Sequence, residues 1–247
     1  MKFKPTELRE LLSSSYHKQK FDIGKFKIDG DLSDERIKVY VVENTNDVVV
    51  VHRGSQDIND WIDNLAYLEL NILKNTKTYK IHLKLHMKVV KKYGAENIIV
   101  LGHSRGGLYA TELYKDNLAS QLITYNKPLN KYDVIDGVIS NDDDDNVVDI
   151  RTSGDITSSG KIITQKNKND VVIPSTTYNP LTEHSTKALS RLDDNELIGS
   201  GIFKPKIDYT KIRKNELKKF IKTNKKRFGV NITGLTKKQM IQIIEAV

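Results

Sequence analysis

A glycine-rich turn between two regular elements constrains the fold of this chain most strongly. Residues 97–101 form a short run rich in apolar side chains, which is typical of a buried parallel strand. The turn that follows reads Gly102-His103-Ser104-Arg105-Gly106-Gly107, and residues 107–115 have the pattern of a helix. A strand, a Gly-x-Ser-x-Gly turn and a helix in this order predict a nucleophile elbow, a strained turn that presents a serine.

The remaining elements predict an α/β fold around that turn. Two β-branched runs flank a turn-like segment and predict an antiparallel hairpin, and a long amphipathic segment before the elbow predicts a helix. The predicted strands are at 37–42, 47–52, 97–101, 121–125 and 146–152, and the predicted helices at 75–93, 107–115 and 182–192. Strands that alternate with helices indicate a mostly parallel sheet.

The chemistry of the elbow depends on Ser104. Side chains in place of Gly102 and Gly106 would collide with neighbouring backbone, and the helix that starts at Arg105 would point free N–H groups at an oxyanion beside the serine. We expect Ser104 to be exposed on the turn. A glycine-rich phosphate-binding turn is the alternative, but the lysine of that motif does not follow and no acidic ribose ligand is evident.

A serine nucleophile needs a general base, and six histidines compete for that role: His17, His52, His82, His86, His103 and His184. His17 is isolated, and His52 and His103 lie too close in sequence to the elbow motifs. His82 and His86 are four residues apart on the predicted helix, but Leu83 replaces the Glu of a zinc-protease motif, so we expect a solvated or half-buried pair. His184 comes late in the chain, where hydrolases with the order Ser, Asp, His place the base.

Two aspartates are candidates for the acid that orients His184. Asp155 follows the predicted strand at 146–152, and a loop after the carboxyl end of a strand is where such an acid belongs. Asp170 lies in another turn-like stretch, but only 14 residues separate it from His184. The sequence therefore favours Asp155 and leaves Asp170 as the alternative.

Three motifs in order resemble the class 3 (fungal-type) lipase family. The segments Val51-His52-Arg53-Gly54-Ser55 and Asp60-Trp61-Ile62-Asp63-Asn64-Leu65 resemble its strand end and the Trp-containing segment after it. The turn at 102–107 resembles the family's Gly-His-Ser-Leu-Gly-Gly elbow, and Thr124-Tyr125-Asn126-Lys127-Pro128 is similar to its Thr-Phe-Gly-x-Pro strand end. The resemblance covers about residues 37 to 190.

This resemblance implies an α/β-hydrolase fold and a serine hydrolase that cleaves carboxylic esters through an acyl-enzyme, as lipases, esterases and phospholipases do. Ser104, Asp155 and His184 would be the catalytic residues. The backbone N–H groups of Ser55 and Arg105 would hold the oxyanion. The family implies an ester or lipid substrate, no cofactor and no metal.

Several residues depart from the family pattern. His52 replaces an aromatic residue, Arg105 an aliphatic one and Asn126 a glycine. These changes predict a more polar substrate pocket than one for triglyceride. The residues that would lie in or beside a lid over the site are Ile58, Trp61 and Ile62.

Positive charge is concentrated at the C-terminal end. The formal net charge is +8, yet residues 204–247 hold 13 Lys or Arg against three acids, which leaves residues 1–203 at −2. Apolar stripes at 217–221 and 240–244, with Thr236 and Gln239 as a capping box, predict two helices. The pattern resembles a SAP-like helix–extended–helix module, a fold associated with DNA binding.

We therefore expect two domains, an α/β-hydrolase domain at 1–203 and a basic helical module at 204–247. The partner of this module would be nucleic acid, an anionic lipid surface or an acidic protein, or it would dock on the hydrolase domain. The residues expected to bind there are Lys218, Lys219, Lys222, Lys225, Lys226, Arg227, Lys237 and Lys238.

Composition excludes several classes of site. The 247 residues contain no cysteine, which excludes disulfides, thiolate metal sites and a cysteine nucleophile. No apolar run approaches the roughly 20 residues that span a bilayer, and the start lacks the apolar stretch of a secretory signal. We therefore expect a soluble intracellular protein, alone or in a larger assembly. The rival hypothesis is a catalytically weak or inactive hydrolase-fold body that tethers a nucleic-acid- or partner-binding tail.

Overall fold

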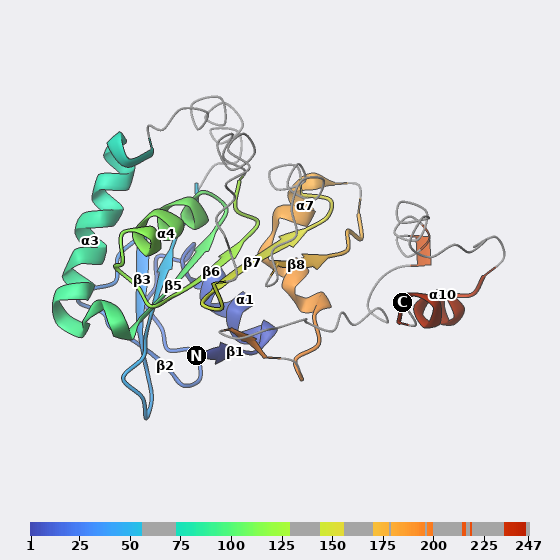
Figure 1. Cartoon of the computed structure of the whole chain (residues 1–247), viewed down its shortest axis with the longest axis horizontal. Helices are drawn as coiled ribbons and strands as arrows, with labels where there is room; N and C mark the ends of the chain where they lie inside the picture. The colour runs from blue at the N-terminus through green and yellow to red at the C-terminus, as the bar shows by residue number, and fades with distance from the viewer. Residues whose placement is uncertain are drawn as a thin grey trace.

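A seven-stranded sheet lies at the centre of the molecule (Figure 1). The computed structural model describes residues 1–55, 73–128, 144–155, 170–177, 179–195, 197–199, 214–215, 218 and 235–245. The strands, in their order across the sheet, are β2 (Phe26–Ile28), β3 (Ile37–Val42), β4 (Val48–His52), β5 (Ile98–His103), β6 (Gln121–Tyr125), β7 (Val147–Thr152) and β8 (Asp170–Ile173). β2, β3 and β4 pair antiparallel, and β4 to β8 pair parallel. A separate antiparallel pair joins β1 (Lys2–Phe3) to β9 (Ile198–Gly199).

Helices cover both faces of this sheet (Figure 1). The α-helices are α1 (Pro5–Ser14), α3 (Lys77–Tyr93), α4 (Arg105–Lys115), α7 (Pro180–His184) and α10 (Lys237–Glu245), and the 3-10 helices are η2 (Leu73–Asn75), η3 (Ala95–Asn97) and η4 (Thr186–Arg191). α1 and η4 pack into the core on one face, and α3 and α4 pack into the core on the other.

The alternation of buried side chains along each central strand explains why both cores exist. In β4, Val49 and Val51 belong to the core under α1, whereas Val48 and Val50 belong to the core under α3 and α4. Because successive side chains of a strand point to opposite faces, a strand covered on both sides has to be apolar at every position. Val48–Val51 of β4 and Ile98–Leu101 of β5 have this uninterrupted apolar pattern because helices cover both of their faces.

The structure confirms the predicted α/β class with a mostly parallel sheet, as well as the antiparallel hairpin β3–β4 and the long helix α3. The late helix predicted at 182–192 is wrong as a single element. It divides at Ser185, whose backbone is extended and whose side chain accepts from Lys187 N, so that α7 ends and η4 begins there. α1 and β8 were not among the predicted elements.

The capping box predicted for the last helix is confirmed. Thr236 N donates to the Gln239 side chain at 2.9 Å and Gln239 N donates to the Thr236 hydroxyl at 3.3 Å, and α10 begins at the next residue, Lys237. Lys218 and Lys238 also lie among the described residues. The other predicted binding residues of the tail, Lys219, Lys222, Lys225, Lys226 and Arg227, lie outside them, and the two-domain division and the SAP-like module stay predictions.

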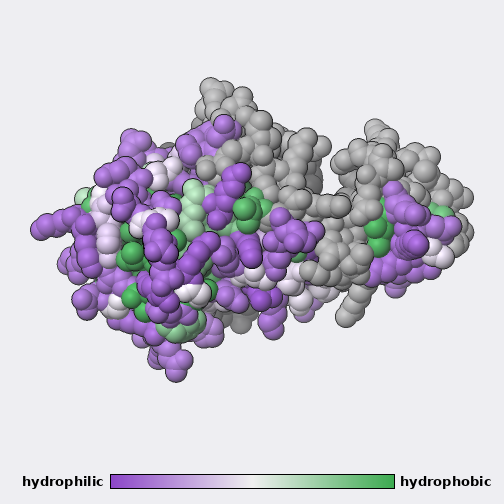
Figure 2. All heavy atoms as spheres, turned by 90° about the horizontal axis from the view of Figure 1, so that it is seen from below, coloured by the Kyte–Doolittle hydropathy of each residue, from purple (hydrophilic) through white to green (hydrophobic). Residues whose placement is uncertain are grey.

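The visible surface is mostly polar. Hydrophilic residues dominate the face shown in Figure 2, and hydrophobic ones form small separate groups. In the part of the chain that the structure describes, no helix is both long enough and apolar enough to cross a membrane.

Candidate active site

The predicted elbow is present where β5 ends. Ser104 has φ 56° and ψ −132°, a backbone conformation that residues other than glycine rarely adopt. Helix α4 begins at the next residue. A Cβ at Gly102 would lie 2.5 Å from Gly107 N, and one at Gly106 would clash with the carbonyl oxygen of His52. The steric requirement for glycine at both positions is therefore confirmed.

The prediction that Ser104 is exposed is wrong, because its residue surface is only 4% accessible. One reason is the close approach of the chain after β4. A Cβ at Gly54 would lie 3.1 Å from the Ser104 Cβ, so glycine at that position lets the two segments meet. The Ser104 backbone N–H is also engaged, since it donates to the carbonyl oxygen of Tyr125 at 2.9 Å.

Asp155 and His184 meet beside the carboxyl ends of the parallel strands. Their Oδ1 and Nδ1 atoms are 2.9 Å apart, and both residues are buried. Asp155 lies just beyond β7, where its backbone N–H donates to the carbonyl oxygen of Thr152 at 3.1 Å. His184 is the last residue of α7. A carboxylate that accepts from Nδ1–H leaves His184 Nε2 as the nitrogen able to accept a proton.

Asp170, the alternative acid, lies at the amino end of β8, whereas Asp155 lies beyond the carboxyl end of the neighbouring strand β7. It is the first residue of β8 and pairs in register with Asp149, whereas Thr152 pairs with Ile173 at the end near Asp155. Parallel strands place all their carboxyl ends at one edge, so Asp170 begins the strand whose other end lies near the elbow.

Two side chains bind the backbone at the C-terminal end of α7, where His184 lies. His103 Nε2 donates to the carbonyl oxygen of His184 at 2.8 Å, and Asn126 Nδ2 donates to that of Glu183 at 2.9 Å. Asn126 has φ 45°, a conformation that asparagine tolerates better than most residues. This explains how asparagine occurs where the resembled family has glycine.

The sequence position of His103 argues against a role as the base, and its contacts agree with a positioning role. Its Nε2 donates to a carbonyl oxygen, so its Nδ1 accepts from the Tyr16 hydroxyl at 2.7 Å. Burial, reinforced by the neighbouring His184, lowers the pKa of His103 to about 3. Burial raises the pKa of Tyr16, so this hydroxyl keeps its proton.

A buried ion pair, missed by the sequence reasoning, supports the same segment. Arg191 Nη1 and Nη2 donate to the two carboxylate oxygens of Glu183 at 2.6 and 3.0 Å. Glu183 Oε1 also accepts from the backbone N–H groups of Thr176 and Thr177. No sequence signal pointed to this pair, because a Glu and an Arg eight residues apart are too common to stand out.

The prediction of a solvated or half-buried His82–His86 pair is wrong. Both rings are buried and form a cluster with His52, which is fully buried as well. His52 Nδ1 is 3.0 Å from His82 Nδ1, and His52 Nε2 is 3.2 Å from His86 Nδ1. Among the described residues, no group of three or more His, Cys, Asp or Glu side chains has an arrangement that could hold a metal ion.

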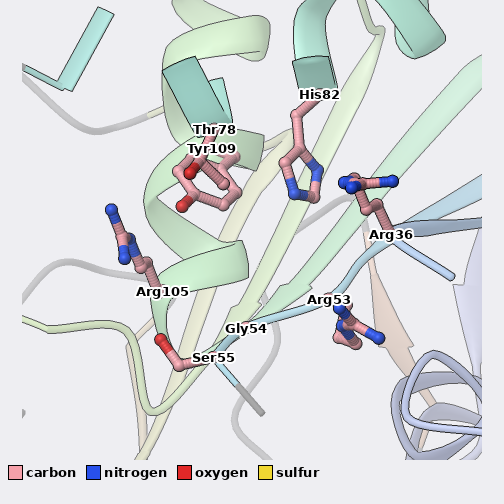
Figure 3. A pocket seen from close by; sticks show the side chains of 8 residues that line it. All are labelled: Arg36, Arg53, Gly54, Ser55, Thr78, His82, Arg105 and Tyr109. Carbon is pink, nitrogen blue, oxygen red and sulfur yellow. The ribbon is translucent and has the colours of Figure 1, made fainter. Parts of the chain in front are cut away.

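Ser55 and Arg105, the residues proposed from the resemblance to supply the oxyanion donors, line one cavity together with Gly54 (Figure 3). Gly54 approaches Ser104 closely and Arg105 follows it, so this cavity lies next to the elbow. The predicted lid residues Ile58, Trp61 and Ile62 lie outside the described residues.

No family model matches this chain, and no curated protein sequence matches it either. Solved structures of lipases are similar to it at low identity. The Lip2 lipase from Yarrowia lipolytica is 16% identical with a TM-score of 0.46, and 79% of this chain and 82% of that one are covered. A Rhizomucor miehei lipase–propeptide complex has the same identity and score with 81% of each chain covered. A triacylglycerol lipase from Penicillium expansum is 16% identical with a TM-score of 0.42, covering 70% and 79%.

Proposed function

We propose that this protein is a serine hydrolase that cleaves carboxylic esters. The observation that carries the proposal is the buried His184–Asp155 hydrogen bond of 2.9 Å at the sheet edge where Ser104 occupies a strained strand-to-helix turn. A serine, a histidine and an aspartate in these roles form the catalytic triad that many acyl-transfer enzymes use. Among the described residues, no feature favours the rival hypothesis of an inactive body.

In the proposed reaction, Ser104 Oγ attacks the ester carbonyl carbon while His184 Nε2 takes the hydroxyl proton. Asp155 accepts from Nδ1–H, which keeps the imidazole in the required tautomer and stabilises its positive charge. The tetrahedral intermediate then collapses, His184 returns the proton to the departing alcohol, and an acyl-enzyme remains. Water attacks the acyl-enzyme with His184 again as base, which releases the carboxylic acid and restores Ser104.

Negative charge that develops on the carbonyl oxygen needs fixed donors. The backbone N–H groups of Ser55 and Arg105 fill this role in the proposal. Arg105 is the first residue of α4, so its N–H belongs to the positive end of that helix and has no partner within it. Removing one such donor in other hydrolases costs about 100- to 1,000-fold in turnover.

Labelling with a fluorophosphonate probe tests the proposal directly, because the probe phosphonylates only an activated serine. We expect the wild-type chain to be labelled and to hydrolyse a series of p-nitrophenyl esters, and Ser104→Ala to lose both properties while it keeps the wild-type melting temperature. Ser120→Ala is the control, since the Ser120 hydroxyl donates to the carbonyl oxygen of Ile98 at the start of β5. Labelling that persists in Ser104→Ala would show that another residue is the nucleophile.

A further inference from the structure

A cavity of about 160 Å³ lies beside the proposed oxyanion donors. Side chains from α3, α4 and the adjoining ends of β3 and β4 form its wall (Figure 3). A water molecule needs only roughly 10–15 Å³ of such volume, so the cavity has room for a group of several heavy atoms. The His82 imidazole points from α3 into this space.

Three arginines make this cavity positive: Arg36, Arg53 and Arg105. Arg53 N donates to the carbonyl oxygen of Arg36 at 2.9 Å, so these two residues are neighbours across the β3–β4 hairpin. Arg36 lies 3.8 Å from Asp34 in a partly exposed pair. Within the described part of the chain, neither Arg53 nor Arg105 forms an ion pair. The positive charge of Arg53 and Arg105, which no carboxylate of the described residues pairs with, favours an anionic ligand.

Arg105 suits an anionic ligand by its shape as well as its charge. Its guanidinium lies 5.8 Å from the centre of the Tyr109 ring, and both residues line the cavity. The planar guanidinium matches the oxygens of phosphate and carboxylate groups. An oxyanion in the cavity would therefore find a suitable partner in Arg105.

The hydrogen bonds of the histidine cluster define which ring nitrogen of His82 carries the proton. His86 Nε2 lies 2.9 Å from the carbonyl oxygen of Leu118, which can only accept, so this nitrogen carries the proton. His86 Nδ1 then accepts from His52 Nε2, and His52 Nδ1 accepts from His82 Nδ1. Burial lowers the pKa of His82 to about 3, and Asp34 opposes this effect while Arg36, Arg53 and Arg105 add to it. The neutral His82 therefore keeps Nε2 as a hydrogen-bond acceptor.

We propose that the pocket formed by Arg36, Arg53, His82 and Arg105 binds a phosphate monoester, and that the substrate is an acyl ester of glycerol phosphate. The substrate class rests on the proposed ester hydrolysis at Ser104. A phosphate monoester carries about −1.5 to −2 charges at neutral pH, which suits three arginines, and its singly protonated form has an O–H for His82 Nε2. A phosphodiester has neither the second charge nor this hydroxyl. Because Arg105 directly follows Ser104, a phosphate in the pocket would lie near an ester carbonyl at the nucleophile.

Thr78 offers a substitution that tests the pocket with little risk to the fold. It lines the cavity from the first turn of α3 and is exposed. A glutamate there favours the helix because negative charge near the N-terminus is stabilising, yet it would put a carboxylate into the anion site. Thr78→Gln is the matched neutral control, and Arg53→Gln removes one of the proposed ligands.

Binding of glycerol 3-phosphate, inorganic phosphate and glycerol would be measured by titration calorimetry on the full chain. We expect both phosphates to bind in competition, glycerol not to bind, Thr78→Gln to match the wild type, and Thr78→Glu and Arg53→Gln to bind at least about tenfold more weakly. Equal binding by wild type and Thr78→Glu, or no binding of either phosphate at about 10 mM, would overturn the proposal.

Rates of hydrolysis then test the proposed substrate class separately from the proposed ester hydrolysis. Substrates with one acyl chain would be compared as the glycerol phosphate ester, the corresponding glycerophosphocholine ester and the uncharged glycerol ester. We expect kcat/KM to be highest for the phosphate monoester and this preference to fall about tenfold or more in Thr78→Glu but not in Thr78→Gln. Phosphate binding without any ester hydrolysis would refute the proposed enzyme but not the pocket. Hydrolysis without preference for the phosphate monoester would refute the substrate class alone.

Discussion

At the scale of single residues, backbone geometry restricts which side chains the site can use. Ser104 and Asn126 both have positive φ, and they follow β5 and β6, two adjacent parallel strands. Asn126 compensates for its conformation with side-chain hydrogen bonds, among them one from Thr152 N to its Oδ1 at 2.8 Å. Strained residues that neighbouring elements hold in place are common at active sites, which supports a functional role for this sheet edge.

The first residue-scale prediction concerns the acid. Asp155→Asn should reduce kcat for a short p-nitrophenyl ester by about 10⁴, because an amide cannot hold the imidazole in the required tautomer. The matched control is Asp170→Asn, which removes the same charge from the first residue of β8 and should stay within a few-fold of wild type. If Asp170→Asn caused the large loss and Asp155→Asn did not, the acid would have been assigned to the wrong strand.

At the scale of elements, the short helix α7 depends on its contacts for its position. It has only five residues, too few to be stable by itself. Glu183 ties it to Arg191 in η4 and to the chain after β8, and Asn126 and His103 bind its last carbonyl oxygens. The helix that carries the histidine proposed as general base is therefore held by contacts from four other segments.

Arg191→Gln tests this arrangement. It leaves the Glu183 carboxylate buried without its countercharge, so the free energy of unfolding should fall by about 3–5 kcal/mol. Urea unfolding followed by circular dichroism measures this change. Lys187→Gln removes the same charge from an exposed position of η4 and should change stability by less than about 0.5 kcal/mol. Equal effects of the two substitutions would show that the ion pair does not stabilise α7.

The basic tail makes its own prediction at this scale. Suppose that residues 204–247 bind duplex DNA through about five phosphates. A plot of the logarithm of the binding constant against the logarithm of the salt concentration should then have a slope near −4 to −5. Replacing Lys225, Lys226 and Arg227 by Gln should make this slope shallower by up to about 2.7. The control replaces Lys80, Lys84 and Lys88 of α3. Binding to anionic vesicles but not to DNA at matched salt would contradict the nucleic-acid hypothesis.

At the scale of the whole molecule, four buried histidines make stability depend on pH. Burial lowers the pKa of His52, His82, His86 and His103, so the folded chain keeps them neutral. The unfolded chain protonates them below about pH 6.5 and therefore binds more protons. The free energy of unfolding should thus fall as pH falls from about 7 to 5, by up to about 1.4 kcal/mol per pH unit for each histidine.

Urea unfolding at several pH values measures this slope. His86→Gln removes one titrating group, so the slope should become shallower by up to about 1.4 kcal/mol per pH unit. His17→Gln, at an exposed position, should leave it unchanged. A wild-type free energy of unfolding that is constant between pH 7 and 5 would contradict the conclusion that these four histidines are neutral in the folded chain.

The sequence by itself determined the elements whose physics is local. The alternation and length of the apolar runs predicted β3 to β7, and the glycines around Ser104 predicted the elbow, because each of these patterns reflects the conformation of its own segment. The capping box at Thr236 was predicted for the same reason. The proposal of Asp155 as acid and His184 as base also came from sequence order, and it stays a prediction.

Only the tertiary structure decided which distant side chains meet. His52 and His82 are 30 residues apart, and Glu183 and Arg191 lie in two helices that the sequence predicted as one. The three arginines of the cavity come from residues 36, 53 and 105, and nothing in their spacing predicts that they face one space. Burial and charge at such places depend on how helices pack across a sheet, and the local pattern of side chains carries no information on that packing.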